Sequence, residues 1–298
     1  NIIDETTLEL SLSEDLPGEP IALPQIAPHL VTHFFQTKRG QQSVSTIDKS
    51  TQLKVENILE RWNYEFSQYD IKNAAAIVID VQTNEVSAYC GNVGFKESTA
   101  GNQVDVIQAE RSTGSILKPF LYHAALQEGE ILPKTLLPDI PMNINGFSPQ
   151  NFNLQFEGAV HASDAVIRSL NIPLVYMLRE YSVPKFYTFL KQNKISTLPR
   201  PASHYGLSLI LGGAEARLGE VSNAYSNMAR TLQGLESTKY KLLLDEKEQP
   251  IKTSFEAGAV WQVFDALKEV NRPEEIDRRA IRPRQQIAWK TGTSFGFR

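Results

Sequence analysis

A single cysteine, Cys90, occurs among the 298 residues, so no disulfide can form within the chain. No apolar run approaches the length of about 20 residues that a transmembrane helix needs. Lysine and arginine (30) do not outnumber aspartate and glutamate (34), and the formal net charge is -4. The single cysteine excludes a fold that is held together by disulfides. The charge balance gives no basic surface for nucleic acid, so we expect no nucleic-acid partner.

The N-terminal stretch also has few basic residues, and none precedes Lys38. The basic n-region of a signal peptide is therefore missing, and we expect a targeting or anchoring segment upstream of Asn1 in the natural protein. Residues 1–28 are acidic and proline-rich, which favours an extended arm. The runs His29–Phe35 and Gln42–Ile47 are rich in β-branched and aromatic residues, and we expect them to form a hairpin. We assign residues 1–48 to this N-terminal linker or anchor segment.

Residues 49–298 have the mixed pattern of an α+β domain. Apolar spacing predicts a helix over 51–66, then a hairpin from the runs 73–80 and 85–90. A mostly helical lobe is expected over about 119–256, with one more helix over 257–270. The run 287–293 returns to a strand pattern, and only five residues follow Thr293, so we expect C-terminal strands to be missing from this sequence.

Three short motifs that carry hydroxyl and amine side chains follow one another along the chain. They are Ser115-Ile116-Leu117-Lys118, Ser169-Leu170-Asn171 and Lys290-Thr291-Gly292-Thr293. In the first motif, Pro119 directly follows and predicts that a helix begins near Ser115, because proline is tolerated in a first turn. A serine there lies beside free backbone N–H groups that can hold an oxyanion. Lys118, three residues on, lies on the same helix face.

A serine hydroxyl becomes a nucleophile only when a base takes its proton. Lys118 can do so only as a neutral amine, so its pKa must fall well below the ordinary ~10.4. Burial and a second cation both lower a lysine pKa, and Lys290 is the candidate cation. Another Ser-x-x-Lys, from Ser182 to Lys185, lacks the preceding Gly-Ser turn and follows the second motif, so we predict no catalytic part for it.

The second motif falls between helical segments, so we expect Leu170 to face the core while Ser169 and Asn171 face away. Ser169 can relay a proton between Lys118 and a leaving amine, and Asn171 can hold Lys118 and a substrate amide. Taken alone, the tripeptide is also typical of an ordinary polar turn.

The third motif alternates as a strand does, with Lys290 and Gly292 on one face. Gly292 lets another backbone approach closely, and a peptide substrate can pair along such a strand. The N–H of Thr293 is a candidate second oxyanion donor. Lys290, Thr291 and Thr293 are candidate ligands for a carboxylate.

In these motifs the chain resembles the penicillin-binding transpeptidase family, and within it the transpeptidase part of class A members of the 1C type. The resemblance covers nearly the whole chain from about Ile26. Further supporting segments are Ala27–Leu30, Arg111–Tyr122, Pro149–Phe152, Tyr205–Gly213 and Ala288–Arg298. It implies an α+β fold shared with serine β-lactamases, namely an antiparallel five-stranded sheet flanked by helices plus a mostly helical lobe. The active site is then expected between these two parts.

The resemblance also implies the chemistry. Ser115 is the expected nucleophile, Lys118 the base, Ser169 and Asn171 the proton relay and substrate support, and residues 290–293 the binding strand. The implied reaction is DD-transpeptidation, in which stem peptides of peptidoglycan are cross-linked through an acyl-enzyme. β-Lactams are the expected inhibitors and cell-wall synthesis proteins the expected partners, with no cofactor and no metal. The implied location is periplasmic, with anchoring by an upstream segment.

Other functions stay open at this point. A serine β-lactamase shares the first and third motifs, although the class A type requires an aspartate where this chain has Leu170. A DD-carboxypeptidase differs only in passing the acyl group to water. A penicillin-binding fold kept as a sensor or scaffold has no need of the chemistry, and the intact motif side chains argue against it.

Overall fold

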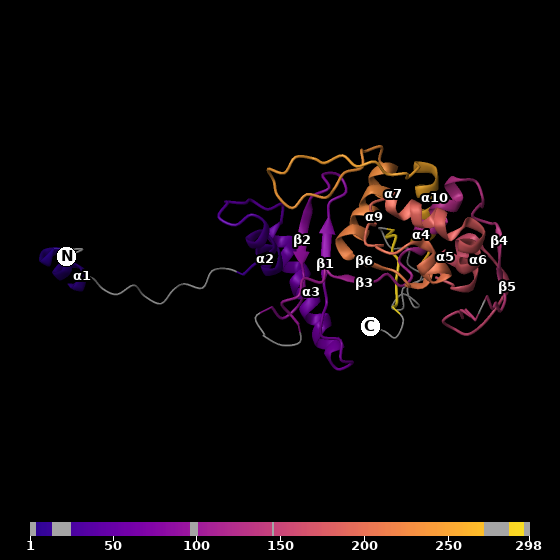
Figure 1. Ribbon diagram of the computed structural model, residues 1–298, viewed down its shortest axis with the longest axis horizontal. Coiled ribbons are helices and arrows are strands. Elements are labelled where there is room, and N and C mark those ends of the chain that lie inside the picture. The colour runs from indigo at the N-terminus through magenta and orange to yellow at the C-terminus, as the bar shows by residue number, and fades with distance from the viewer. Residues whose placement is uncertain (1–3, 14–24, 96–100, 145, 271–285, 295–298) are drawn as a thin grey trace.

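We describe residues 4–13, 25–95, 101–144, 146–270 and 286–294 from a computed structural model of the chain. Two parts lie side by side in Figure 1: a helix-covered hairpin nearer the N-terminus, and a mostly helical part. The first helix, α1 (Glu5–Ser13), has no buried residue and lies apart from both. This combination of strands and helices is the α+β arrangement that the sequence predicts.

The hairpin part has helices packed on both sides of two strands. Its elements are α2 (Pro28–Thr37), α3 (Lys49–Ser67), β1 (Ala76–Ile79) and β2 (Val86–Cys90). The strands pair antiparallel, and α2 and α3 both contact β2. Gln52 of α3 accepts the N–H of Tyr89 at 2.7 Å and donates to its carbonyl at 3.1 Å, which ties helix to strand. The predicted helix at 51–66 and the hairpin that follows it are therefore confirmed.

The expected hairpin over residues 29–47 is wrong. Residues 28–37 form α2, because Pro28 suits a first helical turn and Leu30 and Phe34, four residues apart, pack on one face against the hairpin core. Residues 42–47 form no strand, and Ser45 makes an isolated bridge to Leu243. A short run of aromatic and β-branched residues fits the apolar repeat of a helix as well as that of a strand. Here the burial of one helical face determines that the run forms a helix.

The second part surrounds one central helix. Its elements are β3 (Glu110–Ser112), α4 (Lys118–Gln127), β4 (Leu136–Asp139), β5 (Gly158–His161), α5 (Ala162–Ile167), α6 (Ile172–Tyr181), α7 (Val183–Gln192), α8 (Ala202–Tyr205), the 3-10 helix η1 (Gly206–Leu211), β6 (Glu215–Arg217), α9 (Leu218–Leu232) and α10 (Ala257–Lys268). Every residue of α4 from Lys118 to Ala125 is buried. A helix enclosed on all sides belongs to the centre of a domain, and the expected helical lobe is built around it.

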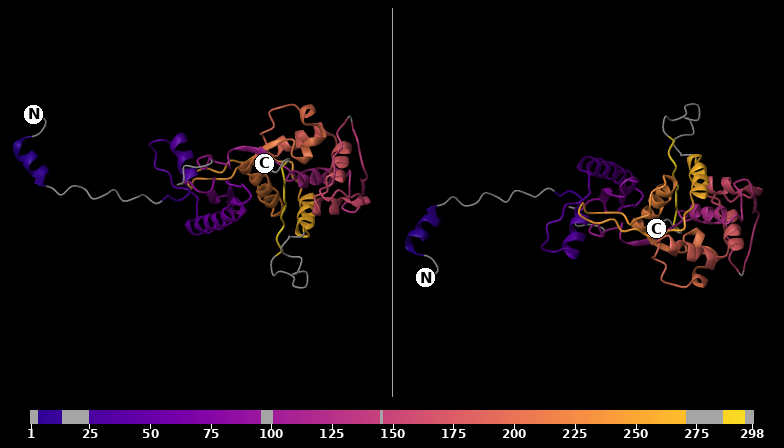
Figure 2. Two further views of the ribbon diagram at one scale, coloured as in Figure 1. Left: turned by 90° about the horizontal axis from the view of Figure 1, so that it is seen from below. Right: turned by 90° about the horizontal axis from the view of Figure 1, so that it is seen from above.

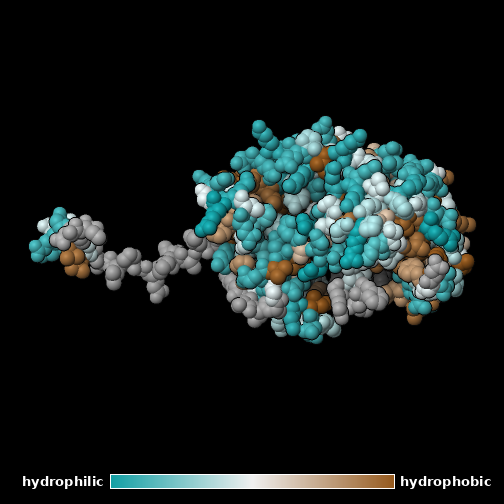
Figure 3. All heavy atoms as spheres, in the orientation of Figure 1, coloured by the Kyte–Doolittle hydropathy of each residue, from teal (hydrophilic) through white to brown (hydrophobic). Residues whose placement is uncertain are grey.

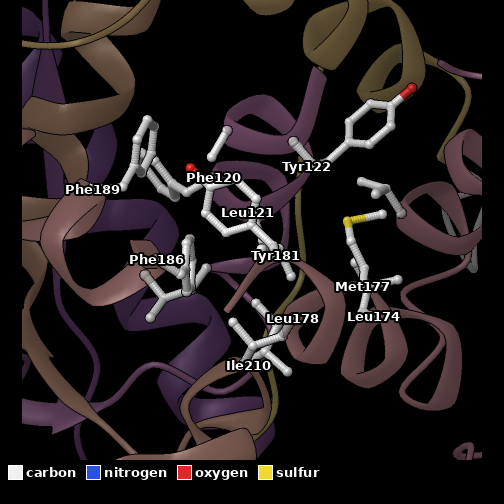
Figure 4. Packing of buried hydrophobic residues seen from close by; sticks show 14 of the residues in the cluster. Phe120, Leu121, Tyr122, Leu174, Met177, Leu178, Tyr181, Phe186, Phe189 and Ile210 are labelled. Atoms are coloured by element: carbon white, nitrogen blue, oxygen red, sulfur yellow. The ribbon is translucent and has the colours of Figure 1, made fainter. Parts of the chain in front are cut away.

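The core of this part is apolar and contiguous. Figure 4 shows Phe120 and Leu121 of α4 among side chains of α6 and α7, including Leu178 and Phe186. Burying each such side chain fully contributes about 1.5–3 kcal/mol. The surface in Figure 3 is mostly hydrophilic, with apolar side chains gathered near the end that carries β4 and β5. The described helices include none long and apolar enough to cross a bilayer.

Strands in the described residues pair as three separate two-stranded ladders: β1 with β2, β3 with β6 and β4 with β5. The five-stranded sheet is thus not formed within this part of the chain. Residues 286–294 run alongside α10, as the yellow segment in Figure 2 shows, and they form no strand. Within this segment the N–H of Trp289 donates to the carbonyl of Leu267 on α10, at 3.3 Å.

Candidate active site

The first motif forms a turn that leads into α4. The helix begins at Lys118, three residues later than expected, because Ile116 N–H bonds the carbonyl of Thr113 at 3.1 Å and Lys118 N–H that of Ser115 at 3.3 Å. These are i to i+3 bonds, so Ser115 lies in a tight turn before the regular helix. Pro119 occupies the first helical turn, as predicted. The Ser115 side chain faces the cleft described below.

Lys118 points from the base of α4 into the second motif. Its side chain is fully buried. Its Nζ donates to the carbonyls of Ser169 (2.8 Å) and Leu170 (3.1 Å) and to Oδ1 of Asn171 (2.7 Å). Burial lowers the pKa of Lys118 well below its ordinary value, and the nearby Lys290 cation lowers it further. Both causes are those that the sequence suggested.

The second motif is the short link between α5 and α6. Leu170 joins the apolar core, whereas Ser169 and Asn171 face the cleft, as expected. Ser169 has a left-handed backbone (φ 54°), which a residue with a side chain adopts only when its surroundings hold it there. Nδ2 of Asn171 donates to the carbonyl of Gln150 at 2.7 Å, so both ends of this amide are engaged.

The third motif lies directly on the nucleophile turn. A Cβ on Gly292 would come within 2.7 Å of Ile116, and one on Gly114 within 2.6 Å of the carbonyl oxygen of Thr293. The predicted close backbone approach at Gly292 is thus present. Lys290 Nζ donates to Oγ of Ser169 at 2.9 Å, and it also contacts the carbonyl of Thr291. Burial lowers the pKa of Lys290 to about 8.

A cleft of about 890 Å³ opens where the motifs meet. From the motifs it is lined by Ser115, Ser169, Asn171, Thr291, Gly292 and Thr293. Apolar side chains at its walls include Phe147, Phe152 and Leu211. Neither Ser115 N–H nor Thr293 N–H has an acceptor within the described part of the chain. A serine hydroxyl at the cleft thus lies near an amine of lowered pKa and a second lysine, both behind the cleft wall, and near two N–H groups that have no acceptor among the described residues.

All eight predicted site residues are brought together. Ser115, Lys118, Ser169, Asn171 and residues 290–293 come from three distant segments and meet at this cleft or directly behind it. The other Ser-x-x-Lys segment, Ser182 to Lys185, does not line this cleft. Hydrogen bonds to Glu128, and to a lesser extent to Glu130, raise the pKa of Lys185. That is the opposite of what a lysine base needs. In the described residues, no cluster of His, Cys, Asp or Glu is arranged to hold a metal.

Three supporting residues were not singled out by the motifs. Tyr225 of α9 donates its hydroxyl to the carbonyl of Ile116 at 2.8 Å and so anchors the nucleophile turn. Asn151 and Asp139, each 1% exposed, form a polar network beneath the second motif. Asn151 lies in a segment that supported the family resemblance, which was a usable signal. Asp139 and Tyr225 carry no local pattern, since only the folded chain brings them to the site.

A fold of this kind with these three motifs around one cleft is typical of acyltransferases of the penicillin-binding class. The chain matches the family described as penicillin binding protein transpeptidase domain over residues 74–297, and it belongs to that family.

Curated relatives agree with this assignment. The chain is 33% identical to penicillin-binding protein 1C of Escherichia coli (strain K12) over 282 residues, covering 94% of this chain and 35% of that protein. It is 28% identical to penicillin-binding protein 1F of Bacillus subtilis (strain 168) over 234 residues, covering 75% of this chain and 32% of that protein. The chain thus spans about a third of the length of these relatives.

Solved structures support the fold. The apo transpeptidase domain of Burkholderia pseudomallei penicillin-binding protein 3 aligns with a TM-score of 0.68 at 21% identity, covering 86% of this chain and 78% of that chain. The PonA1 protein from Mycobacterium tuberculosis in complex with penicillin V aligns with a TM-score of 0.63 at 18% identity, covering 83% and 69%. These likenesses confirm the predicted fold class.

Proposed function

We propose that this chain is a DD-transpeptidase domain that cross-links peptidoglycan stem peptides through an acyl-enzyme on Ser115. The observation that carries the proposal is Lys118, a fully buried amine with a lowered pKa at the start of the helix that follows Ser115. Burying an amine costs stability unless it is hydrogen-bonded, and here the second motif supplies three acceptors for the Lys118 amine. A perturbed lysine beside a cleft-lining serine is the arrangement that nucleophilic catalysis requires.

In the acylation step, neutral Lys118 takes the proton of the Ser115 hydroxyl, and Oγ attacks the carbonyl carbon of the penultimate D-Ala. The N–H groups of Ser115 and Thr293 hold the oxyanion. The C–N bond then breaks, and the leaving D-Ala amine takes a proton that passes from Lys118 through Ser169. The bond from Lys290 Nζ to Ser169 Oγ at 2.9 Å supports this relay because it orients the hydroxyl.

Deacylation reverses these roles. The amine of a neighbouring stem peptide gives a proton through Ser169 to Lys118 and attacks the acyl carbon, and the ester oxygen of Ser115 leaves and regains its proton. During acylation, before the terminal D-Ala leaves, the terminal carboxylate of the donor is held by the Lys290 ammonium and the hydroxyls of Thr291 and Thr293. A β-lactam presents the same carbonyl and carboxylate, so we expect it to acylate Ser115 and leave slowly. The same proposal places the domain outside the cytoplasm among cell-wall synthesis proteins.

Labelling with a fluorescent penicillin tests this function. We expect one covalent label, lost in Ser115→Ala and in Lys118→Ala, because the first removes the nucleophile and the second the base. Ser182→Ala is the matched control from the other Ser-x-x-Lys segment and should label like the unmodified chain. Labelling that survives Ser115→Ala would show that the nucleophile is wrongly assigned. Rapid hydrolysis of a chromogenic cephalosporin would instead favour a β-lactamase.

A further inference from the structure

A buried polar network joins the β4–β5 hairpin to the second motif. Oδ1 of Asn151 accepts the backbone N–H groups of Asn171 at 2.9 Å and Ile172 at 3.1 Å. These two N–H groups are at the start of α6, where Asn171 makes no side-chain cap of its own. Asn151 thus caps the helix from another segment and fixes the backbone of Asn171.

Asp139 at the end of β4 determines which way the Asn151 amide faces. Nδ2 of Asn151 donates to Oδ1 of Asp139 at 2.7 Å and to the carbonyl of Gln155 at 2.9 Å. A carboxylate accepts and does not donate, so it selects the amide orientation in which Oδ1 points at α6. The amide therefore has four partners, and Asn151 is 1% exposed.

The same carboxylate reaches the other end of the second motif. Oδ2 of Asp139 accepts the N–H of Glu157 at 2.9 Å. The Glu157 carboxylate forms a two-pronged ion pair with Arg168, the residue before Ser169, with one bond of 2.9 Å. The short link between α5 and α6 is thus held at both ends by residues of one hairpin.

We infer that Asn151, oriented by Asp139, is a positioning residue for the base: it holds Asn171 where its Oδ1 accepts the hydrogen bond of Lys118. This inference rests on the proposed function and adds a residue that the three motifs do not contain. The chain of contacts runs from Asp139 to Asn151, from Asn151 to the backbone of Asn171, and from the Asn171 side chain to Lys118 at 2.7 Å.

Without the cap, the N–H groups of Asn171 and Ile172 lose their acceptor and the first turn of α6 can move. Small displacements of a catalytic group reduce rates steeply, so we expect Asn151→Ala to lower the penicillin acylation rate constant on the order of tenfold or more. Asp139→Asn should also lower the acylation rate constant, because the asparagine has one acceptor oxygen for the two N–H groups of Asn151 and Glu157. The reduction should be smaller than in Asn151→Ala.

A double-mutant cycle separates positioning from general destabilisation. Asn171→Ala removes the acceptor that Asn151 positions, so Asn151→Ala should have little further effect on the acylation rate in that background. Asn193→Ala is the matched control. Asn193 is also 1% exposed and bonds Phe189 and Ser254 around another helix end, away from the cleft. It should lower the melting temperature without changing the acylation rate of folded protein.

Two further measurements test the inference. One is the pH profile of acylation, and the other is the NMR signal of the Lys118 side chain in protein with ¹³C-labelled lysine. The charged groups near this network include Lys118, Lys290, Asp139, Glu157, Asp164 and Arg168. We expect Asn151→Ala to shift the pH profile and the Lys118 signal, and Asn193→Ala to shift neither. The NMR signal reports on positioning even if Ser115 takes no label, which would contradict the proposed function alone. Additive effects in the cycle, or an unchanged Lys118 signal in Asn151→Ala, would overturn the inference.

Discussion

At the scale of single residues, the site depends on two lysines that share one buried region. The sequence predicted that Lys118 is made less basic by burial and by Lys290, and the structure has both causes in that order of size. The sequence also predicted that Asn171 holds Lys118, which the structure confirms, but it did not predict the two hydrogen bonds from Lys118 to the carbonyls of Ser169 and Leu170. Those acceptors depend on how the α5–α6 link is folded, and no local pattern reports that.

The two lysines also determine the expected pH dependence. Acylation needs Lys118 neutral and Lys290 charged, and burial lowers the pKa of Lys290 to about 8. The rate constant for penicillin acylation should therefore rise as Lys118 loses its proton and fall as pH rises through about 8, when Lys290 loses the charge that holds the carboxylate.

Labelling rates measured between about pH 6 and pH 10 check this expectation. Lys290→Arg should lose the descending limb near pH 8, whatever its maximal rate, because arginine stays charged. A descending limb that is unchanged in Lys290→Arg would contradict the assignment of that limb to Lys290.

At the scale of elements, helices with regular apolar spacing were predicted well. The segment 51–66 became α3 and 257–270 became α10, since apolar residues recur in both at helical intervals. Residues 29–35 were predicted as a strand but form part of α2. An aromatic run of that length fits the apolar repeat of a strand or of a helix until its packing is known. The start of α4 was placed three residues early, since Pro119 indicates a first turn but not how tightly the chain enters it.

One prediction concerns the turn that carries the nucleophile. Tyr225→Phe removes the hydroxyl that bonds the carbonyl of Ile116 at 2.8 Å and keeps the ring, whose centroid lies 4.7 Å from that of Phe120. We expect the free energy of unfolding to fall by about 1 kcal/mol, because a buried carbonyl loses its partner. Acylation should slow while the label stays on Ser115.

Chemical denaturation and labelling rates measure the two effects. Tyr187→Phe is a suitable control, since it removes a hydroxyl bonded to the carbonyl of Leu198 at 2.9 Å, and neither residue lines the cleft. Equal slowing of acylation in both variants would show that Tyr225 acts only through stability.

At the scale of the whole molecule, the site is assembled from segments about 175 residues apart, as positions 115 and 290 indicate. The motif order predicted that these segments meet, and they do. The pairing of β1 with β2 was predicted as a hairpin. The environment of residues 287–293 was not, because a strand pattern does not say what the N–H groups of the segment will bond. In the structure, Trp289 bonds α10 instead, and the motif docks through glycine contacts.

Those glycine contacts give a prediction about assembly. Gly114 has a left-handed backbone (φ 50°), and a Cβ there would meet the Thr293 backbone at 2.6–2.8 Å. Gly114→Ala should therefore displace the third motif from the nucleophile turn and abolish labelling. Gly129→Ala also places a side chain at a left-handed position (φ 73°) but with nothing within 4 Å. Gly129→Ala should lower the stability of the protein but still be labelled by penicillin. Equal labelling of the Gly114→Ala and Gly129→Ala variants would contradict the proposed docking of the third motif.

The central claim is that Ser115 is acylated and that the acyl-enzyme persists. Intact mass spectrometry after exposure to penicillin, followed over hours with peptide mapping, tests it most directly. We predict a single adduct with the mass of one penicillin, located on Ser115 and still present at the last time point. No adduct, an adduct on another residue, or an adduct that is lost within minutes would contradict the account.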